Sequence, residues 1–197
     1  MAAVPSRDRR RVDPRVREEA REQRAAVDDV GTVLAAAARL LEARPRAVAD
    51  VRLRLARAGY RADLVEAAVV RLSELGYLDD EEFATAWIAS RDRAHPRGER
   101  ALRMELARAG VDRAVVDAVL DERATHAAAV ANDPEDGTTI DEESALRLLQ
   151  SRRAGLDRVP DPRRRRERAY ALLARSGFDP DTASRAIGRF TPDADAD

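Results

Sequence analysis

A pattern of 15 residues occurs three times in the chain, and it limits the possible folds more than any other feature. Residues 55–69 read LARAGYRADLVEAAV, residues 106–120 read LARAGVDRAVVDAVL, and residues 173–187 read LARSGFDPDTASRAI. The copies align without a gap, and each places a glycine and an apolar residue between two amphipathic stretches. Glycine readily adopts the left-handed conformation that ends a helix. Each copy therefore predicts a helix, a tight turn and a second helix.

A further amphipathic stretch precedes each copy and predicts a third helix in every unit. We expect these helices at 29–43, 79–93 and 141–153, the last of them ending at Gly155. The start of the second is the clearest, because Asp79 and the acidic residues after it suit the positive end of a helix dipole. The sequence therefore predicts an all-α fold of tandem three-helix repeats.

The repeats divide the rest of the chain into connecting and terminal segments. The predicted repeats comprise residues 27–77, 78–131 and 141–190. Residues 132–140 contain Pro, Gly and acidic side chains, so we expect an inserted loop there. Residues 1–26 alternate Arg with Glu and Asp and lack an apolar stripe, and residues 191–197 form an acidic tail. We expect both ends to be disordered.

Composition supports helices and excludes several classes of site. Hydrophobic residues make up 44% of the chain, aromatic residues only 4% and charged residues 37%, which fits amphipathic helices better than a β-sandwich. The chain has no cysteine, so disulfides and thiolate metal sites are excluded, and the cytoplasm is the expected compartment. No apolar run reaches the roughly 20 residues that span a bilayer, so we expect no membrane association.

The motifs of common catalytic and metal sites are missing from the sequence. All 36 basic residues are arginine, so a phosphate-binding loop that requires lysine cannot occur. The two histidines, His95 and His126, lie 31 residues apart, whereas a metal site needs more ligands at closer spacing. We therefore expect no enzymatic activity, no cofactor and no metal.

The segment LGYLDDEEFATAWIASR, Leu75 to Arg91, resembles the signature of the RecX family. RPRAVADVRLRLARAGY, Arg44 to Tyr60, resembles the first repeat of that family, and RRRRERAYALLARSGF, Arg163 to Phe178, resembles its third. The resemblance covers about residues 30 to 190. Pro45, the acidic insert and the Arg-rich extension depart from the family pattern, and the insert puts in doubt how far the third repeat reaches.

The resemblance implies both a shape and a function. Members of the family form elongated, curved helical proteins that lie in the groove of the RecA nucleoprotein filament. There they restrain filament extension, ATP hydrolysis and strand exchange, and so regulate recombination, DNA repair and the SOS response. The resemblance thus implies a monomeric regulator whose partner is the RecA filament.

Arginines cluster just before each repeat glycine, and these are the candidate partner-binding residues. They are Arg52, Arg54 and Arg57 in the first repeat, Arg97, Arg100, Arg103 and Arg108 in the second, and Arg163, Arg164, Arg165, Arg166, Arg168 and Arg175 in the third. Equivalent helices could place their guanidinium groups along one face, where they would suit DNA phosphates or acidic surfaces of a filament subunit. Alternatively, they form solvated helix faces balanced by Glu and Asp.

A stand-alone protein that binds the nucleic-acid backbone is the alternative function. The net charge of −1 and the shortage of Asn and Gln near the second helix of each pair argue against a reader of base sequence. For the aromatic residues, we expect Trp87 to pack in the core with Phe83. Tyr60, Tyr77 and Phe178 should cover the helix-ending turns, although an exposed one could stack on a base.

Overall fold

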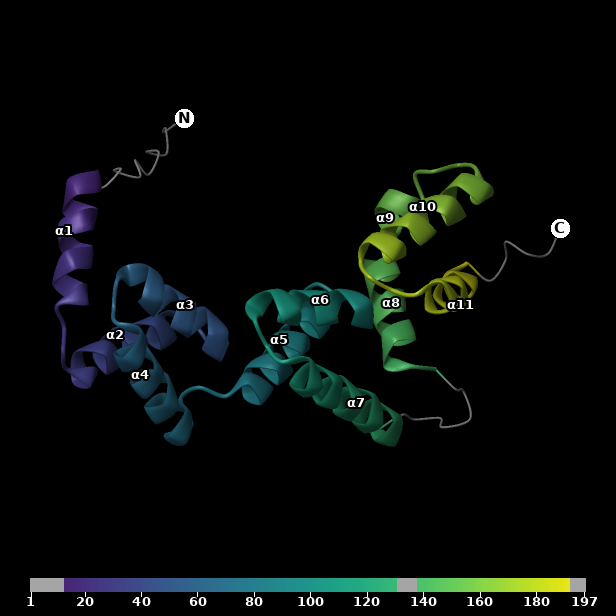
Figure 1. The fold of residues 1–197 in the computed structure, drawn as a ribbon. Coiled ribbons are helices and arrows are strands. Elements are labelled where there is room, and N and C mark those ends of the chain that lie inside the picture. The colour runs from purple at the N-terminus through teal and green to yellow at the C-terminus, as the bar shows by residue number, and fades with distance from the viewer. Residues whose placement is uncertain (1–12, 131–137, 192–197) are drawn as a thin grey trace, which may run out of the picture. The chain divides into compact units, whose positions relative to one another are not determined.

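The structure, a computed structural model, describes residues 13–130 and 138–191. Within these ranges the regular secondary structure consists of helices without any strand (Figure 1). The chain forms two compact units that divide between Leu78 and Asp79. This division lies one residue after the boundary expected between the first and second repeats, which was between residues 77 and 78. The second and third repeats, in contrast, belong to one unit.

The first unit contains the three helices of the first repeat. Its helices are α2 (Val30–Ala43), α3 (Val48–Ala58) and α4 (Ala62–Glu74). They enclose a core of buried apolar side chains: Val33, Ala37, Val51, Leu55, Val65, Ala68, Val69, Leu72 and Leu78. Gly59 ends α3 with a φ of 104°, a left-handed conformation that side chains disfavour. The predicted turn between the two aligned helices is confirmed.

The N-terminal extension contains a helix, α1 (Pro14–Ala25), so the expectation of disorder is wrong for these residues. Asp13 caps the helix by accepting a hydrogen bond from the backbone N–H of Arg15, and Pro14 occupies its first turn. No residue of α1 is buried, which explains why no apolar stripe announces it. Instead, Arg24 donates a hydrogen bond of 3.4 Å to the carbonyl of Ala58, beside the turn at Gly59. Residues 1–12 lie outside the described part of the chain.

The second unit contains the other two repeats. The second repeat comprises α5 (Asp80–Ala94), α6 (Glu99–Ala109) and α7 (Arg113–Val130). The third comprises α8 (Ile140–Ser151), the short α9 (Arg153–Leu156), α10 (Pro162–Arg175) and α11 (Pro180–Phe190). Most of the predicted insert, as well as the acidic tail after Thr191, falls outside the described residues.

One helix of the third repeat differs from the prediction. The stretch expected to be continuous from Asp141 to Arg153 ends at Ser151, and the four-residue helix α9 follows. Gly155 lies inside α9 and does not adopt the left-handed conformation that would end a helix. The third repeat therefore has a fourth, short helix, and its core is completed by Leu156 from that helix.

The aligned positions of the three repeats have the same role in the core. Leu55, Leu106 and Leu173 stand at the same place in the pattern, and each is at most 2% exposed. Phe178 is buried and covers its turn as expected, whereas Tyr77 is 69% exposed and does not. Trp87 is half-buried, and its ring lies 5.8 Å from that of Phe83. In the described part of the chain, no helix is both long and apolar enough to cross a membrane.

Candidate partner-binding site

The candidate arginines of the first repeat are partly neutralised within the unit. Arg52 of α3 forms a bidentate ion pair with Glu66 of α4, with N–O distances of 2.6 and 3.0 Å. This hydrogen bond lowers the pKa of Glu66. Arg54 donates to Asp50 one turn earlier, at 2.9 Å. Arg57 is exposed and forms no ion pair with another described residue.

The second repeat has the same cross-link between its last two helices. Arg103 of α6 pairs with Asp117 of α7 at 3.0 Å, and these residues stand where Arg52 and Glu66 stand in the first repeat. Arg103 also pairs with Glu99, and Arg97 lies 3.5 Å from Glu105. The Arg103–Asp117 pair therefore serves the packing of α6 on α7. Within residues 13–130 and 138–191, Arg100 and Arg108 have no acidic partner.

The arginines at the start of α10 make weaker contacts. Arg163 lies 3.5 Å from Glu167, Arg164 lies 3.6 Å from Asp161, and their side chains are 89% and 80% exposed. Arg165 donates to the carbonyls of Val159 and Pro160 and thus holds the loop before the helix. Arg166 and Arg168 are exposed.

Three of the candidate arginines form a set that recurs from repeat to repeat. Arg57, Arg108 and Arg175 occupy the same position in their repeats, in the last turn of α3, α6 and α10. None of the three forms an ion pair with a described residue, and each suits the negative end of its helix dipole. All three belong to the arginine clusters that the sequence places before the repeat glycines.

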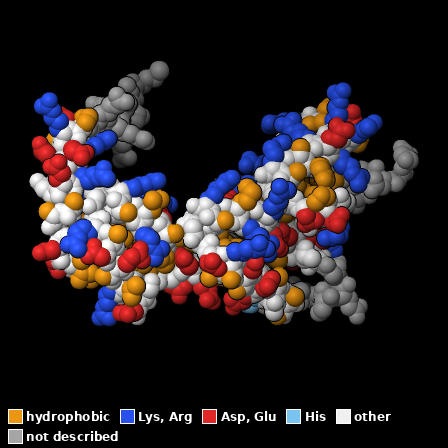
Figure 2. All heavy atoms as spheres, in the orientation of Figure 1, with side chains coloured by type: hydrophobic (Ala, Val, Ile, Leu, Met, Phe, Trp, Pro, Cys, Tyr) orange, Lys and Arg blue, Asp and Glu red, His pale blue; other side chains and the backbone are white. Residues whose placement is uncertain are grey.

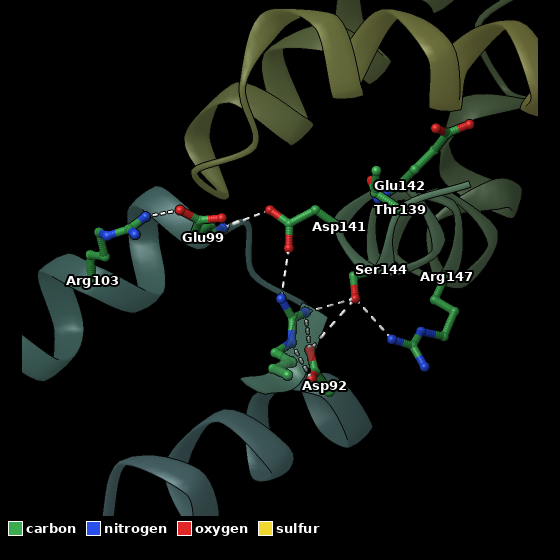
Figure 3. A network of polar contacts seen from close by, with 9 residues as sticks. Asp92, Glu99, Arg103, Thr139, Asp141, Glu142, Ser144 and Arg147 are labelled. Atoms are coloured by element: carbon green, nitrogen blue, oxygen red, sulfur yellow. Dashed lines mark hydrogen bonds and ion pairs between the residues drawn. The ribbon is translucent and has the colours of Figure 1, made fainter. Parts of the chain in front are cut away.

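The second and third repeats are joined by a largely buried polar network around Arg123 (Figure 3). Arg123 of α7 binds both carboxylate oxygens of Asp92 at 2.9 Å and one oxygen of Asp141 at 2.8 Å. It also donates to the hydroxyl of Ser144 at 3.3 Å. The second oxygen of Asp141 accepts the backbone N–H of Glu99 at 2.8 Å. One guanidinium group thus connects α5 and α7 with the first turns of α8.

The repeat alignment shows what this network replaces. Arg123 stands where the first repeat has Leu72 and the third has Phe190, and both of those side chains are buried. Its partner Asp92 stands at the position of Leu41, which packs against the core of the first unit. A charged pair at a core position requires further polar partners, and α8 supplies them. This requirement explains why the second and third repeats form a single unit.

Backbone contact completes the junction of these two repeats. The N–H of Gly98 donates to the carbonyl of Ser176 at 3.1 Å. A Cβ atom at Gly98 would lie only 2.4 Å from the carbonyl oxygen of Gly177. The start of α6 can therefore approach the end of α10 only because neither residue has a side chain.

The pKa of Asp141 is raised, because burial of the carboxylate outweighs the hydrogen bond and charge of Arg123. Between its unfolded value of 3.8 and this raised value, the folded state retains a proton that the unfolded state has lost. This carboxyl therefore contributes less to stability as the pH rises through that window.

We expect the parent protein to lose stability relative to the Asp141→Asn variant as the pH rises from about 4 to 7, because asparagine does not titrate. The quantity to compare is the free energy of unfolding of the two proteins at each pH. Urea unfolding at several pH values, followed by the fluorescence of Trp87, measures this difference, because the single tryptophan lies in the second unit. A difference that shifts in favour of the parent with rising pH would show that Arg123 dominates and would contradict the prediction.

The described residues contain no group of His, Asp and Glu side chains that could hold a metal ion. Their arrangement defines an all-α protein of tandem three-helix repeats that presents arginines at equivalent positions. Residues 79–120 match the family model of the second three-helix domain of RecX.

The regulatory protein RecX of Mycobacterium sp. strain JLS is 36% identical over 141 residues, which cover 71% of this chain and 71% of that protein. The regulatory protein RecX of Mycolicibacterium vanbaalenii is 44% identical over 82 residues, which span 42% of this chain and 45% of that relative. The chain belongs to the RecX family. A crystal structure of RecX from Lactobacillus salivarius shares the fold, with a TM-score of 0.68 at 16% identity over 84% of this chain and 98% of that one.

Proposed function

We propose that the protein binds the RecA–DNA filament and inhibits its extension, its ATPase activity and strand exchange. The recurrence of Arg57, Arg108 and Arg175 at one position of the repeat carries the proposal. A guanidinium group that lacks an internal acidic partner is available for a carboxylate or phosphate of a partner. The other candidates, such as Arg52 and Arg103, have an internal role and contribute less.

The mechanism follows from linking several weak contacts. One exposed ion pair contributes at most about 1 kcal/mol, so a single arginine would not hold a partner. Contacts from successive repeats act together, because the first bound repeat raises the effective concentration of the next. A chain attached to neighbouring recombinase subunits would slow both dissociation and the rearrangement that accompanies ATP turnover. The proposal includes the cytoplasm as the place of action and a monomer as the active form.

The ATPase rate of the cognate RecA on single-stranded DNA tests the proposal. We expect the rate to fall as the protein is added at sub-stoichiometric to equimolar amounts at near-physiological salt. The double variant Arg57→Gln with Arg108→Gln should need about tenfold more protein for the same inhibition, which corresponds to roughly 1.4 kcal/mol.

The matched control is Arg61→Gln with Arg71→Gln, which removes the same charge from two exposed arginines that pair with Asp63 and Glu74. The control should inhibit as the parent protein does. No inhibition by the folded parent protein would overturn the proposal and favour the alternative, a stand-alone protein that binds the nucleic-acid backbone.

A further inference from the structure

A hollow of about 310 Å³ in the third repeat is lined by three arginines and no carboxylate. Arg152 comes from the junction of α8 and α9, and Arg168 and Arg175 come from α10. All three are exposed, and none forms an ion pair with a residue that the structure describes. The rest of the lining is Ser151, Gly155, Leu156 and Leu172. Three like charges therefore share one concave site without an internal counter-charge.

Comparison with the other repeats shows why these charges are not neutralised. In the first repeat Asp50 accepts hydrogen bonds from both Arg46 and Arg54, and the third repeat has Arg168 at this position. In the second repeat Glu105 lies 2.7 Å from Arg91 and 3.5 Å from Arg97. The third repeat has Leu172 in its place. The two carboxylates that balance arginines in the earlier repeats are thus replaced by a cation and an apolar residue.

The cross-link between the last two helices is also missing from the third repeat. The residues at the positions of the Arg103–Asp117 pair are Tyr170 and Ser184, neither of which carries a charge. Helix α10 contains six arginines but a single acidic residue, Glu167. Figure 2 shows arginine side chains gathered over α9 and α10. The positive charge thus extends beyond the hollow along the helix, which suits a polyanion better than one isolated ion.

We propose that this hollow binds phosphate groups of a nucleic-acid backbone. A guanidinium group presents two parallel N–H donors that match two oxygens of a phosphodiester. Three such groups around one concavity suit an anion with oxygens in several directions, and α10 continues the contact to neighbouring phosphates. The site goes beyond the proposed function, because it gives the chain a nucleic-acid contact of its own that needs no recombinase.

The test measures binding of a fluorescein-labelled oligothymidylate of about 30 nucleotides by anisotropy, without recombinase, between 50 and 200 mM NaCl. For single strands, each neutralised phosphate contributes about 0.7 to the slope of log K against log salt. The triple variant Arg152→Gln, Arg168→Gln and Arg175→Gln should therefore bind more weakly at low salt and lose about 2 from that slope. Across this salt range its affinity should fall about 15- to 20-fold less than that of the parent.

The control is Arg61→Gln, Arg71→Gln and Arg113→Gln, which makes the same change in net charge. These arginines are exposed, and each lies within 3.4 Å of a carboxylate oxygen of Asp63, Glu74 or Asp117. This variant should keep the slope of the parent. Circular dichroism should give the same helix content for all three proteins, since only exposed side chains are changed.

Three results would overturn the inference. Equal loss of slope in both variants would show that net charge, not the hollow, attracts DNA. Absence of binding by the parent at 50 mM NaCl would leave the hollow without this ligand. Equally effective competition by polyglutamate, compared at the same concentration of charge, would assign the hollow to an acidic protein surface. Each of these results would leave the ATPase test of the proposed function unaffected.

Discussion

Replacing Arg123 with alanine is expected to lower the free energy of unfolding of the second unit by about 3–5 kcal/mol. The substitution leaves Asp92 and Asp141 without their cation, and their side chains are only 19% and 14% exposed. A carboxylate that has lost its partner in such a site pays the full cost of leaving water. Urea unfolding followed by Trp87 fluorescence reports the effect, because Trp87 lies in the same unit.

Two control variants separate the network from a simple loss of charge. Arg113→Ala removes an arginine of the same helix that is 92% exposed, and it should change stability by less than about 0.5 kcal/mol. The triple variant Arg123→Leu, Asp92→Leu and Asp141→Asn restores the leucine pair of the first repeat. It should recover most of the lost stability, because an apolar pair can replace a buried ion pair. A triple variant as unstable as Arg123→Ala would argue against the network as the cause.

The repeat pattern predicts the helices and turns well because both depend on local sequence. The helix-ending glycine and the apolar spacing lie within a few residues of one another, so Gly59 and Gly110 could be assigned to left-handed turns without knowledge of the fold. The all-α class, the three-helix repeats and the RecX family follow from the same local features. The helix α1 was missed because it has no apolar stripe. It is held instead by a contact between Arg24 and Ala58, which lie 34 residues apart in the sequence.

The role of an individual arginine could not be predicted from local spacing. Arg52 and Glu66 lie 14 residues apart and meet only because α3 packs against α4. Arg103 and Asp117 have the same separation, so two of the candidate arginines stabilise helix packing. Arg123 was missed because a lone arginine in an amphipathic helix looks like a surface residue. Extending the alignment to Leu72 and Phe190 would have placed it at a core position and marked it as unusual.

The helix-ending turns at Gly59 and Gly177 are each covered by a neighbouring helix. A tandem repeat buries apolar surface against its neighbours, and its end needs a cover. In the second unit, the start of α6 covers the turn at Gly177 of the third repeat. In the first unit, α1 lies against the turn at Gly59, where an added Cβ atom would lie 2.6 Å from the side chain of Arg21. Helix α1 thus performs for the first repeat the covering role that α6 performs for the third.

Substituting Gly98 with alanine should destabilise the second unit by about 3 kcal/mol, at the upper end of the usual cost of overpacking. The new Cβ atom would lie 2.4 Å from the oxygen of Gly177 and 2.5 Å from the backbone N of Phe178. Both are backbone atoms, so no side-chain rotation relieves the overlap, and α6 must move away from α10. The same urea unfolding measured by Trp87 fluorescence gives the loss.

Gly188→Ala is the matched control for this substitution. Gly188 lies in α11 of the same unit, and an added Cβ atom there would meet no atom within 4 Å beyond its chain neighbours and the backbone of its own helix turns. Alanine favours a helix over glycine, so this variant should be more stable than the parent by about 0.5–1 kcal/mol. Opposite signs for the two substitutions are expected if Gly98 and Gly177 touch in solution. A Gly98→Ala variant as stable as Gly188→Ala would mean that the second and third repeats are held by the Arg123 network alone.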